Sequence, residues 1–279
     1  MSRAAVTPRR ILSGLGLTIA LAALVVICIF PYYWMFITSV KPEDEIFTRT
    51  PQLWTTNPTW DRYADLFQGE FLRQLGNSLI VSLGTVVLTL VFAIGAAYAL
   101  ARLRVRWRTV ILIVLLSLQM LPEIVLIIPL FNFAVQAGFI NTLIGVIVAN
   151  LTTSVAFTVW LLRGYLLSIP NELEEAAWVD GASRFGALWR IVLPLAWPGI
   201  AAAAIYGFIS AWNELLIAVT FLRSDDLRTL PVALQSYFNE YFTDWGGVMA
   251  ASTLFSLPIL IFFGFIQRHL AQGFGGALK

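Results

Sequence analysis

The chain has 279 residues, of which 59% are hydrophobic and only 12% are charged. An ordinary soluble domain carries about 25% charged residues, so this composition excludes a protein that folds mainly in water. We attribute the sequence pI of about 8.8 to membrane topology and not to nucleic-acid binding.

Six apolar stretches are predicted to cross a membrane, for which about 20 apolar residues suffice. The long stretch that starts after Arg108 is divided in two by the polar, glycine-containing segment 136–141. The first stretch continues through Phe36, which favours a membrane span over a cleavable signal peptide. In chain order, the windows lie between Arg10 and Lys41, Arg73 and Arg102, Arg108 and Arg163, Arg190 and Arg223, and Asp244 and Arg268.

The predicted spans divide the chain into three parts. Residues 1–72 hold an N-terminal tail, the first span and an outer loop; residues 73–268 hold a core of five spans with a loop at 168–194; residues 269–279 form a C-terminal tail. Lys and Arg are most frequent on the side that carries both termini, where an arginine cluster occupies residues 102–108. The positive-inside rule therefore predicts a cell-membrane protein with both termini in the cytoplasm.

The chain lacks the residues that an enzyme needs. Its lysines are Lys41 and Lys279, and neither ends a glycine-rich loop that cradles phosphates. A single histidine, His269, excludes histidine-based triads and metal clusters. We expect no catalytic residue, metal or cofactor on this chain, so an energy-supplying ATPase has to be another polypeptide. A secondary transporter also fits the composition, although the two halves show no internal repeat.

The loop 168–190 is predicted to form two short helices joined by a sharp turn. Pro170 suits a first helical turn, Gly181 suits a helix stop with positive φ, and Ser183 suits an N-cap. Helices that lie on lipid prefer Lys and Arg on their polar face, whereas the first of these two helices is acidic. A surface for a partner protein is therefore favoured over an amphipathic connector on the bilayer. The acidic residues are Glu172, Glu174, Glu175 and Asp180.

These residues resemble the EAA signature of permease subunits in binding-protein-dependent ABC importers. The matching pattern is Glu175-Ala176-Ala177, then Gly181 after three residues, then Ile191 and Leu193-Pro194. The chain from Asn77 onward is similar to the carbohydrate-uptake branch, which includes maltose permeases of the MalG type, and departs from it at residues 273–276. The similar stretches are Asn77-Ser78-Leu79-Ile80, Ala97-Tyr98-Ala99-Leu100-Ala101-Arg102, Ile128-Pro129-Leu130, Trp160-Leu161-Leu162-Arg163-Gly164, Ala211-Trp212-Asn213-Glu214, Arg228-Thr229-Leu230-Pro231 and Gln267-Arg268.

The resemblance implies an all-α integral membrane fold, the type I ABC importer permease, with six transmembrane helices and a cytoplasmic coupling helix. It implies a second homologous permease, two ATPase subunits that bind ATP and magnesium, an extracytoplasmic solute-binding protein and surrounding membrane lipid. The loop docks into a cleft of the ATPase, where small residues allow close approach and an acid pairs with a basic partner. The predicted coupling residues are Glu174, Glu175, Ala176, Ala177, Asp180, Gly181 and Leu188.

Polar residues inside apolar spans are costly and are therefore candidates for the solute pathway, with hydrogen bonding between helices as the competing explanation. Aromatic faces suit sugars, so aromatic side chains join the polar candidates. The predicted pathway residues are Gln119, Glu123, Asn150, Tyr206, Trp212, Asn213 and Glu214. Four prolines are expected to kink the spans, namely Pro122, Pro129, Pro198 and Pro258.

The loop 223–246 is rich in aromatic residues, which indicates either a membrane-interface belt or contact with the binding protein. The predicted contact residues are Tyr237, Phe238 and Tyr241. The resemblance implies a sugar or sugar-like solute. The alternative, a glycerophosphate-type solute, is predicted to need cationic groups along the pathway, and none lies within a predicted span.

Overall fold

The computed structural model describes residues 8–238 and 243–275. Within these residues the chain is helical and forms no sheet. One isolated β-bridge pairs Phe238 with Thr243. The prediction of an all-α fold is thereby confirmed. The helices fall into two compact units, one formed by residues 1–68 with 237–254 and the other by residues 69–236 with the chain from Phe255 onward.

The first unit contains a long apolar helix and the loop that follows it. Lys41, at the end of that helix, is buried and donates from Nζ to the carbonyl oxygen of Gln52 at 2.6 Å. Arg62 donates to the carbonyl oxygens of Ser39 and Lys41, at 3.0 and 2.6 Å. Both cations therefore hold the loop in place. The helices are α1 (Pro8–Val40), α2 (Glu43–Ile46), α3 (Asp61–Gln68) and the first turns of α14 (Trp245–Gly275).

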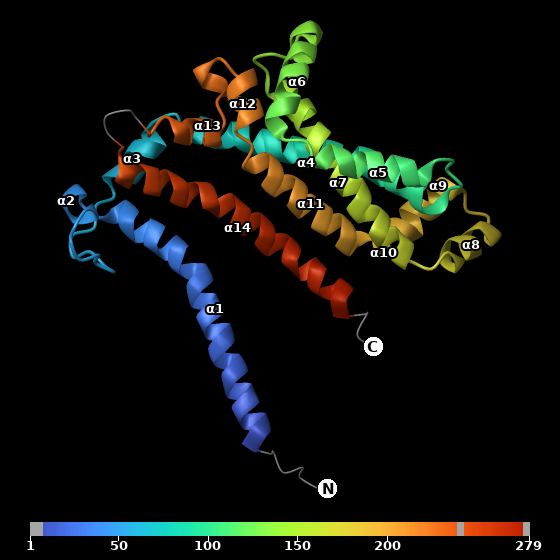
Figure 1. Cartoon of the computed structure of the whole chain (residues 1–279), viewed down its shortest axis with the longest axis horizontal. Coiled ribbons are helices and arrows are strands. Elements are labelled where there is room, and N and C mark those ends of the chain that lie inside the picture. The colour runs from blue at the N-terminus through green and yellow to red at the C-terminus, as the bar shows by residue number, and fades with distance from the viewer. Residues whose placement is uncertain (1–7, 239–242, 276–279) are drawn as a thin grey trace. The chain divides into compact units, whose positions relative to one another are not determined.

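The second unit is built around α4, α7 and α11, which lie side by side (Figure 1). Two apolar clusters form its core, one around Ala93 and Leu162 and the other around Val81 and Phe221. The helix α4 contributes to both, so it runs the length of the core. The helices are α4 (Phe71–Arg102), α5 (Arg108–Gln119), α6 (Glu123–Ala137), α7 (Leu143–Ser168), α8 (Glu172–Val179), α9 (Arg184–Ala187), the π-helix η1 (Leu188–Val192), α10 (Leu193–Leu195), α11 (Trp197–Trp212), α12 (Leu216–Phe221), the 3-10 helix η2 (Asp225–Leu227), α13 (Leu230–Gln235) and the rest of α14.

Close contact between α7 and α11 depends on a glycine. A Cβ atom built at Gly199 lies 2.4 Å from Cγ and 2.8 Å from Cβ of Tyr165. Any side chain at this position forces the two helices apart, because those atoms stand next to the backbone and cannot swing away. Gly199 thus sets the spacing between α7 and α11.

Four helices of the described part are long and apolar enough to cross a membrane: residues 16–40 of α1, all of α4 and α7, and residues 245–267 of α14. The predicted break at 136–141 is confirmed, since α6 ends before Gly138 at φ 73° and Asn141 adopts φ 58°. Two other predicted spans are bent pairs: α5 and α6 meet at 100°, and the segment 184–195 meets α11 at 76°. The sharp α5–α6 bend falls just before Pro122, which cannot donate the backbone hydrogen bond that continues a helix. Pro129 and Pro258 lie inside uninterrupted helices.

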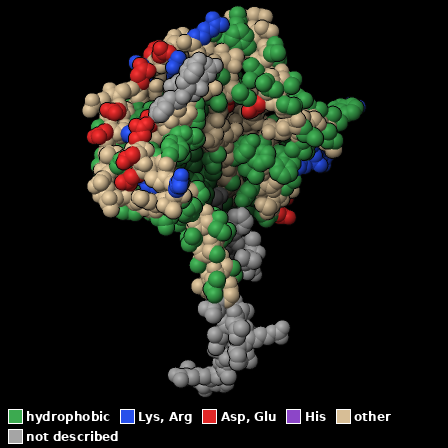
Figure 2. Space-filling model, turned by 60° about the vertical axis from the view of Figure 1, so that its left-hand side comes forward, with side chains coloured by type: hydrophobic (Ala, Val, Ile, Leu, Met, Phe, Trp, Pro, Cys, Tyr) green, Lys and Arg blue, Asp and Glu red, His purple; other side chains and the backbone are tan. Residues whose placement is uncertain are grey.

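Hydrophobic side chains cover much of the face drawn in Figure 2. On α4 the exposed apolar residues include Val87, Val91 and Phe92, whose side chains are more than half exposed. Water disfavours such a surface, whereas hydrocarbon does not. The exposed apolar side chains of the described helices therefore fit a lipid environment.

Candidate functional site

The loop between α7 and α11 folds as the sequence predicts, because its turn residues satisfy the helix ends. Gly181 adopts φ 87° after α8, and the amide of Ala182 reaches back to the carbonyl oxygen of Ala177. The Ser183 side chain accepts a hydrogen bond from the amide of Gly186 at 3.1 Å, which caps α9. Pro170 differs from the prediction: α8 begins at Glu172, so this proline precedes the first turn. The loop is a defined helix, turn and helix.

One predicted coupling residue, Glu174, is enclosed by its own chain. Its side chain is 2% exposed and forms an ion pair with Arg102, whose side chain is 8% exposed. The hydroxyl of Tyr98 donates to the second carboxylate oxygen at 2.9 Å. Arg102 also donates to the carbonyl oxygen of Ile169 at 2.8 Å, at the start of the loop directly after α7. Glu174 therefore joins α8 to α4 and is closed off from any other protein.

The remaining predicted coupling residues divide by burial. Glu175, Ala176, Asp180 and Gly181 are exposed, whereas Ala177 and Leu188 are buried in the chain's own core. The structure therefore brings two exposed acids and two small residues together around the end of α8.

Sequence reasoning missed three apolar side chains on this loop. Val179 is 88% exposed, Phe185 is 69% exposed and Trp189 is 57% exposed. The rings of Phe185 and Trp189 are 5.9 Å apart. Large exposed apolar and aromatic groups are typical of a protein interface. The signal was present in the sequence, since Val179 and Phe185 are large apolar residues within four positions of the turn at Gly181.

Three predicted pathway residues line one cavity of about 270 Å³. They are Gln119 at the end of α5, Glu123 at the start of α6 and Tyr206 on α11. Sequence reasoning missed two other polar members, Thr153 and Ser210. Gln119 donates from its amide to the carbonyl oxygen of Thr153 at 2.6 Å. The bend between α5 and α6 is what brings these groups to one place, and the cavity walls combine hydroxyls, an amide, a carboxylate and an aromatic ring.

Two other predicted pathway residues are buried away from this cavity. Asn150 on α7 is 2% exposed, and neither atom of its amide has a hydrogen-bond partner among the described residues. Trp212 is 1% exposed and stacks with Phe208 and Phe255, while its ring nitrogen donates to the carbonyl oxygen of Phe255 at 3.2 Å. Trp212 thus holds α11 against α14 within the second unit.

The last two predicted pathway residues lie in the turn between α11 and α12. The Asn213 amide donates to the carbonyl oxygen of Ile209 at 2.8 Å and closes α11. The carboxylate of Glu214 accepts hydrogen bonds from the amides of Ile217 and Ala218, at 2.6 and 3.0 Å. An acid at a helix N-terminus satisfies free amides and the helix dipole, so Glu214 has a structural role in this chain.

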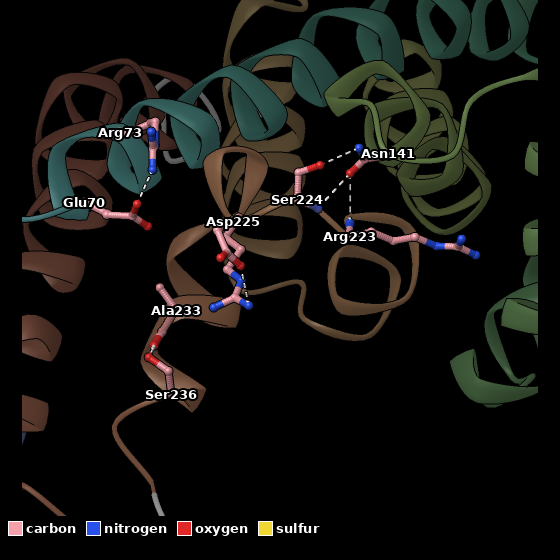
Figure 3. A network of polar contacts seen from close by, with 9 residues as sticks. Glu70, Arg73, Asn141, Arg223, Ser224, Asp225, Ala233 and Ser236 are labelled. Carbon is pink, nitrogen blue, oxygen red and sulfur yellow. Dashed lines mark hydrogen bonds and ion pairs between the residues drawn. The ribbon is translucent and has the colours of Figure 1, made fainter.

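At the other end of the second unit, Asn141 ties two turns together. Its side-chain oxygen accepts hydrogen bonds from the amides of Arg223 and Ser224, and its amide donates to the hydroxyl of Ser224 at 2.7 Å. Figure 3 shows the side chain of Arg223 directed away from Asn141, so only its backbone takes part. The turn before α7 is thereby fixed to the segment after α12.

Of the predicted binding-protein contacts, Tyr237 and Phe238 lie in the first unit, and Tyr241 lies outside the described residues. Phe238 is exposed and meets the ring of Trp245 edge-on at 6.3 Å. Tyr237 is partly buried, and burial together with the negative charge of Asp244 raises the pKa of its hydroxyl. Phe238 is therefore the more accessible of the two.

Residues 74–276 match the family described as "Binding-protein-dependent transport system inner membrane component". The chain belongs to this family. Members are permease components of ABC transporters and not enzymes, as predicted. The match confirms the resemblance noted in the sequence and identifies the chain as a permease of the inner membrane.

Alignments with two named relatives cover almost the whole permease. It is 36% identical to the diacetylchitobiose uptake permease DasC of Streptomyces coelicolor, over 90% of this chain and 92% of that protein. It is 33% identical to the trehalose/maltose transport permease MalG of Thermococcus litoralis, over 96% of this chain and 98% of that protein.

Two solved structures of a bacterial importer of the acidic polysaccharide alginate share the permease fold. One aligns at a TM-score of 0.78 and 23% identity, covering 95% of this chain and 99% of that chain. The other was solved in complex with a periplasmic protein bound to an alginate pentasaccharide, and aligns at a TM-score of 0.60 and 18% identity, covering 90% and 92% of the two chains.

Proposed function

We propose that this permease is half of the translocation pathway of an ATP-driven importer for a sugar or oligosaccharide. The family is binding-protein-dependent, and its curated relatives include permeases for diacetylchitobiose and for trehalose and maltose. A second homologous permease forms the other half. Two ATPase subunits bind ATP with magnesium and hydrolyse it, and an extracytoplasmic protein delivers the solute, as the periplasmic protein of the alginate importer suggests by analogy.

Each bent helix pair counts as one span in this proposal, so the permease crosses the membrane six times with both termini in the cytoplasm. The arginine-rich segment 102–108 and the α8 loop then face the cytoplasm. Labelling of single cysteines placed at Arg104 and at Asp225, in a protein whose native Cys28 is replaced by serine, tests this topology. A membrane-impermeant reagent added outside intact cells is expected to react at position 225 and not at position 104; the reverse pattern contradicts it.

The observation that carries the ATPase-coupling part is the exposed surface around the turn at Gly181. Glu175, Asp180 and Val179 present two acids and one apolar group, while Ala176 and Gly181 leave room for close approach. A basic pocket with an apolar floor complements this surface. We assign the surface to docking in a cleft of the ATPase, with α8 as the coupling helix.

Two substitutions test the docking. Glu175→Lys reverses a charge and Gly181→Leu adds bulk at the turn, so both are expected to uncouple ATP hydrolysis from uptake. Arg104→Gln, on a different loop, is the control because its side chain is exposed and forms no ion pair among the described residues. The measurements are permease abundance in the membrane, co-purification of the ATPase, and uptake. Normal uptake by both variants contradicts the proposal.

The cavity between α5, α6 and α11 is the candidate contact for the solute within this subunit. Its hydroxyls, amide and aromatic ring suit a sugar, which needs hydrogen bonds and an apolar face. No cation is among its lining residues, which disfavours a glycerophosphate-type solute.

Uptake assays distinguish the candidate solutes. Cells carrying the importer are expected to take up a radiolabelled di- or oligosaccharide, and glycerol phosphate in excess is expected not to compete. Depletion of ATP with the proton and sodium gradients maintained is expected to abolish uptake. Uptake that survives this treatment indicates a secondary transporter and overturns the proposal.

A further inference from the structure

The ion pair between Glu174 and Arg102 lies inside the protein, between the loop and the end of α4. Both oxygens of the carboxylate are occupied: Oε1 by Nε of Arg102 at 2.5 Å and Oε2 by the hydroxyl of Tyr98 at 2.9 Å. A second nitrogen of Arg102 donates to the carbonyl oxygen of Ile169. Arg102 therefore holds α8 and the loop residue that directly follows α7 at the same time.

We infer that Tyr98 and Arg102 are positioning residues that fix α8 to α4 through Glu174, so that movement of the docked loop is passed to α4. This inference rests on the proposed docking of α8 in the ATPase. It adds a role for three residues that touch neither the ATPase nor the solute.

The ion pair determines which face of α8 points outward. Glu174 and Ala177 are the buried residues of this eight-residue helix, and they lie on one face because they are three positions apart. Ala177 buries only a methyl group, and the larger apolar residues Leu173 and Trp178 remain 43% and 39% exposed, so apolar burial alone defines the inward face of α8 weakly. The paired carboxylate fixes which face of α8 is turned toward the core, since a buried charge is tolerated only where its partners are. With Glu174 fixed inward, the neighbouring Glu175 and Ala176 must face outward.

The helix α4, to which the movement of α8 is passed, is uninterrupted along its whole length. This helix is 32 residues long. Arg102 is its last residue, and Tyr98 lies about one turn before it. Near its first residues, the side-chain amide of Asn77 donates to the carbonyl oxygens of Asp226 and Arg228, and the hydroxyl of Ser78 accepts from the amide of Leu230. Both ends of α4 are therefore hydrogen-bonded to loops, as a contiguous mechanical link requires.

Ion-pair removal in the complete importer tests the inference. Glu174→Gln and Arg102→Gln are made singly and together, and the complex is purified with its ATPase and reconstituted into liposomes with the binding protein. Solute transported per ATP hydrolysed is expected to fall roughly 2- to 30-fold in each single variant, the range in which single residues modulate coupling between sites. The double variant is expected to be no worse than the single ones, because both remove the same interaction.

A matched control pair stands at the other end of the same helix. Glu70 and Arg73 form an ion pair that is about half exposed, so Glu70→Gln and Arg73→Gln remove the same charges from an exposed setting. Their transport per ATP is expected to equal that of the unmodified protein. A fall as large as that of the buried pair shows that the effect is not specific to the α8 contact and overturns the inference.

The ratio of transport to hydrolysis separates positioning from mere structural support. A merely structural ion pair lowers the amount of assembled complex and leaves the ratio unchanged, and that result overturns the inference. Tyr98→Phe keeps the ion pair and removes one hydroxyl, so it assembles even where the other variants do not. Its ratio is expected to fall by a smaller factor, and an unchanged ratio also overturns the inference. Failure of the proposed function appears separately, as normal uptake by Glu175→Lys and Gly181→Leu.

Discussion

The side-chain amide of Asn77 donates a hydrogen bond to the carbonyl oxygen of Arg228, 3.0 Å away and 151 positions along the chain. It donates a second to the carbonyl oxygen of Asp226 at 2.9 Å. The adjacent Ser78 accepts from the amide of Leu230 at 2.8 Å. Two stretches that carry the family resemblance, 77–80 and 228–231, are therefore direct partners.

Asn77→Leu is expected to destabilise the permease by about 1 to 3 kcal/mol, because Asn77 is buried and two part-buried hydrogen bonds to the carbonyl oxygens of Asp226 and Arg228 are lost. The measurement is the fraction of monodisperse protein that remains in detergent after heating. Gln235→Leu, at an exposed position on α13, is the control and is expected to be neutral. Equal melting temperatures for the two variants contradict this role for Asn77.

A second prediction concerns the close contact of α7 with α11. Gly199→Ala places a methyl group 2.4 Å from the Tyr165 ring and is expected to cost about 1 to 3 kcal/mol. Gly95→Ala is the matched control, because it is also helical and nothing lies within 4 Å of its added Cβ. Thermal unfolding is expected to shift downward for the first variant and to stay or rise for the second. A Gly199→Ala protein as stable as the unmodified one shows that α11 moves away at no cost.

Part of the fold could be predicted from the sequence, because some turns depend only on the residues that form them. Gly138, Gly181 and Ser183 each satisfy a helix end with their own backbone or side chain, so the turns that they form were predicted and are found. The bend at Pro122 was predicted only as a kink. Its size, 100°, depends on how α5 and α6 pack against other helices, which one residue does not determine.

Less of the candidate site could be predicted from the sequence. The acids of α8 are equivalent in the sequence, yet Glu174 is enclosed and Glu175 is exposed. The distinction depends on Arg102, which is 72 positions away and meets Glu174 only after α4 and α7 have packed. Gln119, Glu123 and Tyr206 were each identified as polar or aromatic groups in a span, but their convergence on one cavity needs the α5–α6 bend.

A third prediction separates the backbone role of Gly181 from its role in docking. Its φ of 87° strains any β-branched residue, whereas asparagine tolerates this region. Gly181→Val is expected to destabilise the turn by about 1 to 2 kcal/mol, and Gly181→Asn by less. Limited proteolysis of the loop measures the turn, and co-purification of the ATPase measures docking. Faster cleavage for valine than for asparagine is expected; equal cleavage contradicts a backbone requirement at this position.

A fourth prediction concerns charge selection by the cavity. Glu123 is the one charged residue among those lining it, so an anionic solute meets repulsion there and a neutral sugar does not. Glu123→Gln is expected to leave uptake of the neutral sugar within about threefold and to weaken the discrimination against an acidic oligosaccharide of the same length by roughly tenfold, a change of 1.4 kcal/mol. Ser117→Ala, on an exposed face of α5, is the control. The measurement is the ratio of uptake of the two solutes at equal binding-protein saturation. A ratio that stays the same in Glu123→Gln places the cavity outside the solute's path, because a carboxylate beside a passing anion cannot be removed without effect.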